Sequence, residues 1–104
     1  MKEISVTEFK KLKDEQADFQ LIDVREPFEA EIAQMGGQLI PMGTIADHID
    51  EISKQKQVII HCKSGRRSAT ICQYLEQHGF ENVYNLKGGI LAYAAEIDAS
   101  IPSY

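Results

Sequence analysis

The segment from Cys62 to Ser68 places one thiol among three cationic side chains. Its sequence is Cys-Lys-Ser-Gly-Arg-Arg-Ser, and it follows the short apolar run 57–61, which predicts a buried strand. A helix is expected to follow, because small and apolar residues recur at helical spacing from Ser68, its expected N-cap, to Gly79. The thiol is therefore predicted to lie in a loop between a strand and a helix.

This position favours a thiolate, because the first backbone N–H groups of a helix have no partner within it and carry partial positive charge. Gly65 allows the backbone to turn around the sulfur. A free thiol titrates at about 8.5, and helix N–H groups with nearby Lys or Arg lower that pKa to about 3.5–7.5. We expect Cys62 to be a thiolate at neutral pH. The alternative, a small buried cysteine that ends a strand, does not explain the cations Lys63, Arg66 and Arg67.

The composition narrows the class of protein. The chain has 104 residues, of which 43% are hydrophobic and 26% charged, and this predicts one domain over residues 1–104. The net charge of −5 argues against nucleic acid or an anionic membrane as a partner, whereas the cations near Cys62 favour a small anion or form only a solvated rim. No apolar stretch has membrane-spanning length, and residues 1–5 lack the apolar core of a signal peptide, so we expect a cytoplasmic protein.

Predicted strands and helices alternate along the whole chain. Strands are expected at residues 4–6, 19–24, 38–40, 57–61 and 82–86. Helices are expected at residues 7–12 with Thr7 as cap, 27–33, 44–52, 68–79 and 90–97. This alternation predicts an α/β fold with a parallel sheet covered on both faces. The ligand crevice of such a sheet lies beyond the carboxyl ends of its strands, where Cys62 and segment 23–25 both fall.

Four motifs in this order resemble those of the rhodanese-like sulfurtransferases. They are Leu21-Ile22-Asp23-Val24-Arg25-Glu26, Ile40-Pro41, the loop 62–68 and Leu86-Lys87-Gly88-Gly89. The resemblance covers essentially the whole chain and implies a rhodanese-like fold, with a five-stranded, mainly parallel sheet and helices on both faces. Residues 33–38 depart from the Gly-His-Ile-Pro-Gly-Ala-like stretch of many members. Segments 88–93 and 97–104 are similar to the end of rhodanese domains fused behind enzymes that adenylate sulfur-carrier proteins.

The resemblance implies a sulfurtransferase that works through a persulfide on Cys62. The thiolate would take the outer sulfur of a donor such as thiosulfate or a protein persulfide and pass it to a thiophilic acceptor. Lys63 and Arg66 would bind the anionic part of the donor. The implied partners are a small anionic sulfur donor and a sulfur-carrier or other acceptor protein. From the charge and the residue spacing we expect no nucleic acid, membrane, metal or organic cofactor. The loop N–H groups expected to stabilise the persulfide are those of Lys63, Ser64, Gly65, Arg66, Arg67 and Ser68.

The roles of the charged residues around this loop stay open. Arg67 either faces the pocket or turns inward to pair with a carboxylate, for which Asp23 is the candidate. Arg25 supports the site as a cation at its rim or faces solvent. His61 is expected to be packed or hydrogen-bonded and not to act as a base, because neighbouring residues of a strand point to opposite faces. Cys72 is expected to be a core thiol, since it shares the apolar face of its helix.

Two other functions compete with sulfur transfer. Cysteine phosphatases resemble one another in placing an Arg after five intervening residues, but that position here is Ser68, so the ring of N–H groups is smaller and suits a sulfur atom better. The second alternative is a binding module whose cysteine is idle or senses oxidants or persulfides, because an accessible thiol of low pKa is also typical of oxidation sensors. Persulfide formation from thiosulfate distinguishes this alternative from an enzyme.

Overall fold

One parallel sheet forms the centre of the molecule. The computed structural model describes residues 1–104 and contains five strands in the order β1-β5-β4-β2-β3, with every neighbouring pair parallel. Strands β2 and β4 lie side by side, so that Asp23 and His61 are opposite each other where both strands end. The strands are β1 (Lys2–Ile4), β2 (Phe19–Asp23), β3 (Gln38–Leu39), β4 (Gln57–His61) and β5 (Val83–Leu86).

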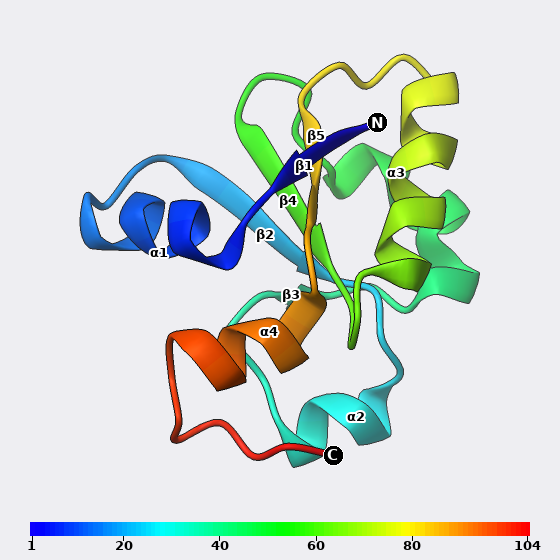
Figure 1. Ribbon diagram of the computed structural model, residues 1–104. Helices are drawn as coiled ribbons and strands as arrows, with labels where there is room; N and C mark the ends of the chain where they lie inside the picture. Colours follow the sequence, from blue (N-terminus) through cyan, green and yellow to red (C-terminus); the bar gives the residue numbers. More distant parts are fainter.

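Helices cover both faces of this sheet (Figure 1). One face carries α1 and α4, which contact each other, and the other carries α3 and η1, a 3-10 helix. Helix α2 lies beyond the carboxyl ends of the strands, close to the carboxyl terminus of the chain (Figure 1). None of the helices combines the length and the apolar character needed to cross a membrane. The helices are α1 (Val6–Asp14), α2 (Pro27–Ile32), η1 (Met42–Glu51), α3 (Arg66–Gln77) and α4 (Gly89–Glu96).

A hydrophobic core lies on each side of the sheet. The side chains of β4 alternate between the two cores, with Val58 and Ile60 on the side of α3 and Ile59 on the side of α1 and α4. Because helices cover both faces of the sheet, all three of these successive residues are apolar and fully buried. Cys72 of α3 lies in the core between the sheet and α3, which confirms that it is a core thiol, as expected.

The predicted alternation of strands and helices is confirmed, but the two predicted N-caps, Thr7 and Ser68, are wrong. Ser5 and not Thr7 caps α1, because its Oγ accepts the N–H of Glu8 in a capping box. Helix α3 begins at Arg66, so Ser68 lies in its first turn and not at its cap. The cap is Gly65, whose φ of +98° falls in the left-handed region that glycine adopts without strain.

The amino end of α4 holds the loop that follows β4. The backbone N–H groups of Ile90 and Leu91 donate to the carbonyl oxygens of Cys62 at 3.0 Å and Lys63 at 3.1 Å. This approach requires glycine at position 89, where a Cβ atom would lie 2.6 Å from the Cys62 oxygen and closer still to that of Lys63. Because these two carbonyl oxygens point toward α4, the backbone N–H groups of the loop residues that follow them point away from α4.

We predict that Gly89→Ala destabilises the protein by at least about 2 kcal/mol, because the new Cβ atom meets backbone oxygens and Gly89 has a φ of +61°. The measurement is the free energy of unfolding in denaturant. Gly43→Ala is the matched control, since a Cβ atom there meets nothing within 4 Å. Equal stability of the two variants would contradict the proposed contact.

Candidate active site

The sulfur of Cys62 lies inside the loop between β4 and α3. The side chain is only 1% exposed and belongs to the core between the sheet and α3. Its Sγ accepts hydrogen bonds from the backbone N–H groups of Gly65 at 3.1 Å and Ser68 at 3.4 Å, and the Ser68 hydroxyl lies 3.3 Å away. Of the six loop N–H groups expected to surround the sulfur, those of Gly65 and Ser68 therefore donate to it, whereas those of Lys63, Arg66 and Arg67 do not.

These hydrogen bonds determine the acidity of the thiol. Burial acts to raise the pKa of Cys62, but the hydroxyl of Ser68 and the backbone N–H groups of Ser68, Gly65 and Ser64 lower it more, so the pKa lies below that of an ordinary thiol. Cys72 shows the effect of burial without such donors, since burial raises its pKa to about 12. Of the two cysteines, Cys62 is thus the one suited to act as a nucleophile.

Asn85 is a buried member of the site that the sequence analysis missed. It lies on β5, is 3% exposed, and its Oδ1 accepts a short hydrogen bond from the Ser68 hydroxyl. Its Nδ2 donates to the carbonyl oxygen of Gly65 at 3.1 Å. A polar residue within a predicted buried strand, one position before its end, was the available signal.

Arg25 is fully buried, which makes both of its predicted positions, at the rim and in solvent, wrong. Its guanidinium donates to both carboxylate oxygens of Asp23 at 2.9 and 2.8 Å. Further hydrogen bonds reach the carbonyl oxygen of Ala33 at 2.7 Å and the Tyr104 hydroxyl at 2.8 Å. A buried charge needs such a complete set of partners, so Arg25 ties β2 to the end of α2 and to the carboxyl-terminal segment.

Arg67 pairs with Glu29 of α2 and not with Asp23, whose partner is Arg25. The pair is bidentate, with distances of 2.7 and 2.9 Å. Hydrogen bonding to Arg67 holds the pKa of Glu29 down at about 2, although burial opposes this, and the Tyr104 hydroxyl adds a donor at 2.7 Å. Arg67 therefore fixes α3 to α2, and its charge is already compensated.

Lys63 and Arg66 are the two loop cations that form no ion pair with a carboxylate. The ammonium group of Lys63 lies 4.5 Å from the centre of the Tyr104 ring, a cation–π contact that orients it without neutralising it. Arg66 is exposed at the first position of α3. No carboxylate neutralises these two side chains, and their expected role in binding an anion stays a prediction.

His61 is packed in the interior, as expected. Its Nδ1 lies 3.4 Å from the carbonyl oxygen of Cys62, and its Nε2 lies 3.9 Å from a carboxylate oxygen of Asp23 and has no hydrogen-bond partner. Burial lowers the pKa of this imidazole, which favours its neutral form. No hydrogen bond joins the ring to Sγ, so the geometry does not make His61 the base for the thiol.

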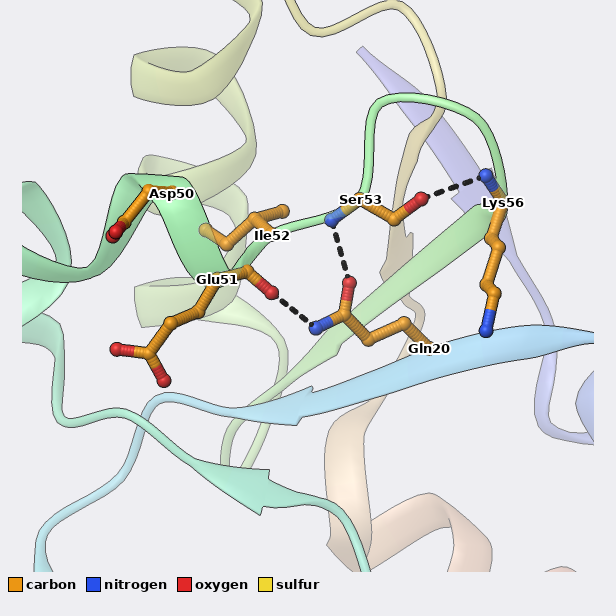
Figure 2. Close-up of a pocket in the computed structure, with 6 residues that line it drawn as sticks. All are labelled: Gln20, Asp50, Glu51, Ile52, Ser53 and Lys56. Atoms are coloured by element: carbon orange, nitrogen blue, oxygen red, sulfur yellow. Dashed lines mark hydrogen bonds between the residues drawn. The ribbon is translucent and has the colours of Figure 1, made fainter.

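A separate polar pocket of about 280 Å³ lies at the amino ends of β2 and β4, at the opposite edge of the sheet from Cys62 (Figure 2). Its central side chain, Gln20, donates to the carbonyl oxygen of Glu51 and accepts the N–H of Ser53, both at 2.8 Å. These groups hold the turn between η1 and β4.

No group of three His, Cys, Asp or Glu side chains in the chain could hold a metal ion.

Comparisons with known proteins find relatives of the sequence. The family model described as Rhodanese-like domain matches residues 5–96. The chain is 44% identical over 90 residues to the Rhodanese-like/PpiC domain-containing protein 12 of Arabidopsis thaliana, and the match covers 82% of this chain but only 30% of that protein. It is 45% identical over 82 residues to a sulfurtransferase of Allochromatium vinosum, with 74% of this chain and 73% of that protein covered.

Two further relatives bear on the fold and on the fused domains. A rhodanese-like domain protein of Staphylococcus aureus has a crystal structure with a TM-score of 0.86 and 32% identity, covering 100% of this chain and 99% of that one. This confirms the expected fold. The probable adenylyltransferase/sulfurtransferase MoeZ of Mycobacterium tuberculosis is 33% identical over 87 residues, covering 81% of this chain and 22% of that protein. The expected similarity to domains of adenylating enzymes is thereby confirmed.

We predict that a small alkylating reagent modifies Cys62 with a pH midpoint below the value of about 8.5 for a free thiol, because its pKa is lowered. Cys72 should stay unmodified in the native protein. The measurement is the alkylation rate as a function of pH, with the modified residue located by peptide mass spectrometry and Cys62→Ser as control. A midpoint at or above the free-thiol value would contradict the hydrogen-bonded thiolate.

We predict that Glu29→Gln lowers the free energy of unfolding at pH 7 by about 1–2 kcal/mol, because it breaks a partly buried ion pair with Arg67. The folded-state pKa of Glu29 is about 2, below its usual 4.5, so its contribution is present above pH 4.5 and declines as the pH falls toward 2. Denaturant unfolding at several pH values between 2 and 4.5 measures this decline, because the free energies of unfolding of the variant and the wild type should approach each other as the pH falls. Glu31→Gln, at an exposed position of α2, is the control; a pH-independent difference would argue against the pair.

Proposed function

This chain belongs to the rhodanese-like domain family, and we propose that it is a sulfurtransferase that carries sulfane sulfur on Cys62. The observation that supports this proposal is the set of donors around Sγ, formed by the N–H groups of Gly65 and Ser68 with the Ser68 hydroxyl. Donors directed at one sulfur atom stabilise both a thiolate and the charge that shifts during sulfur transfer. The proposed donor is thiosulfate or a protein persulfide.

The proposed loading step is attack of the Cys62 thiolate on the outer sulfur of thiosulfate. A bond forms between Sγ and that sulfur, the bond between the two donor sulfurs breaks, and sulfite leaves with the electron pair. The product is the Cys62 persulfide, whose negative charge lies on the terminal sulfur. In the unloading step a thiophilic acceptor attacks this terminal sulfur, and Sγ leaves as the thiolate, which completes a two-step covalent cycle.

Lys63 and Arg66 are the proposed binding residues for the donor oxyanion, since they are the loop cations without a carboxylate partner. Arg25 and Arg67 are proposed as structural supports, because Asp23 and Glu29 already compensate their charges. With Cys62 only 1% exposed, the donor must present its sulfur end-on, which thiosulfate and a persulfide on a flexible segment can do. The proposed protein acceptor is a sulfur carrier, and the relation to MoeZ supports this class.

We predict that the reduced protein gains one sulfur atom from thiosulfate and loses it to cyanide, as measured by intact mass and by thiocyanate formation. Cys62→Ser should abolish the gain, whereas Cys72→Ser should retain it, because the thiol of Cys72 is a buried core residue with a pKa of about 12. Addition of sulfur to Cys62→Ser would contradict the role of Cys62. If the wild type takes sulfur from neither thiosulfate nor a protein persulfide, a sensing or binding module becomes the better description.

A further inference from the structure

The Ser68 hydroxyl has one proton and two acceptors. Its Oγ lies 3.3 Å from Sγ of Cys62 and within a short hydrogen bond of Oδ1 of Asn85. All three side chains are buried, so bulk water does not supply an additional donor or acceptor. A hydroxyl donates one hydrogen bond at a time, and therefore the Ser68 proton can satisfy Sγ or Asn85 but not both.

The backbone fixes which end of the Asn85 amide faces Ser68. Nδ2 donates to the carbonyl oxygen of Gly65 at 3.1 Å, and this carbonyl can only accept. Rotating the amide by half a turn would place its oxygen against the Gly65 oxygen. Asn85 must therefore present Oδ1, a pure acceptor, to the Ser68 hydroxyl. Gly65 also accepts the N–H of Ala69 at 3.2 Å, so its carbonyl keeps one partner if Asn85 is replaced.

We propose that Asn85 is a positioning residue for Cys62, which competes with Sγ for the Ser68 proton and so limits how strongly the hydroxyl stabilises the sulfur anion. With a neutral thiol, the Cys62 S–H donates to Ser68 and the Ser68 hydroxyl donates to Asn85. With a thiolate, the hydroxyl turns to Sγ at the expense of the Asn85 hydrogen bond. No proton leaves its heavy atom when the hydroxyl turns, so the exchange is a rotation and not a transfer.

This competition is useful because a thiolate that is stabilised too strongly becomes a weaker nucleophile. If Cys62 transfers sulfur as proposed above, the charge moves from Sγ to the outer sulfur on loading. The Ser68 hydroxyl then rotates back and donates to Asn85. On unloading, charge returns to Sγ and the hydroxyl turns back to it. This part rests on the proposed function, whereas the competition itself concerns the resting protein and can be tested without any sulfur donor.

The test is a pH titration of the Cys62 thiolate by its ultraviolet absorbance, with Cys62→Ser as the blank. Cys72 stays protonated in the range used. Asn85→Leu removes the acceptor at similar size, so deprotonation of Cys62 no longer breaks the hydrogen bond from Ser68 to Asn85. The thiolate fraction below the midpoint should therefore rise roughly fivefold, the effect expected for one hydrogen bond. Asn85→Asp, which keeps an acceptor and adds a negative charge, should lower that fraction.

The Ser68→Ala background separates the proposed mechanism from a general disturbance of the loop. Without the hydroxyl, Asn85→Leu should leave the thiolate fraction unchanged. Asn82→Leu is the matched control, because Asn82 lies just before β5, at its opposite end, and its Nδ2 holds the carbonyl oxygens of Ser53 and Lys56. A fall or no change with Asn85→Leu, or the same rise without Ser68, would overturn the proposal. If Asn85→Leu does not fold, Asn85→Asp is titrated with and without Ser68→Ala. The proposal is overturned if Asn85→Asp lowers the thiolate fraction by the same factor in both backgrounds.

Discussion

The contact between the amino end of α4 and the loop after β4 determines the geometry of the sulfur. Two N–H groups of α4 bind the carbonyl oxygens of Cys62 and Lys63, and Gly89 lets the two backbones approach. With these carbonyls engaged, the following N–H groups converge on Sγ. The free energy that holds this arrangement comes from backbone packing and from hydrogen bonds to the loop carbonyls, not from contacts with the sulfur, so the donors are in place before any substrate arrives.

A second network connects the charged groups that surround the loop. Asp23, Arg25 and Tyr104 join the end of β2 to the carboxyl-terminal segment, and Glu29 joins Tyr104 to Arg67 of α3. Two of the four basic residues near the site are thereby neutralised within the protein. The net charge of −5 belongs to the whole chain, whereas the loop around Cys62 retains Lys63 and Arg66 as cations without a carboxylate partner. The charge of this loop and the charge of the whole chain thus have opposite signs, which favours small anions beside the loop and not elsewhere on the surface.

The sequence was sufficient for the parts of the site that depend on local pattern. A strand, a glycine and a helix in succession predict the loop around Cys62, and alternating elements predict the parallel sheet. The side-chain partners of Arg67 and Ser68, and the contacts of Arg25 beyond Asp23, could not be predicted, because they depend on how α2, β5 and the carboxyl-terminal segment pack. Glu29 is 38 residues from Arg67 and 75 from Tyr104 along the chain, and no periodicity of the sequence relates such positions.

The depth of Cys62 also selects the molecules that can react with it. A thiolate attacks a disulfide only along the axis of the bond between the two sulfurs, so the attacked sulfur must approach without its substituents meeting the surrounding backbone. With 1% of the residue exposed, a bulky disulfide has little room to align with Sγ, whereas the proposed donors end in a single sulfur atom on a narrow group. If Cys62 carries sulfur as proposed, the enclosed loop limits mixed-disulfide formation by its shape while it admits a single sulfur atom.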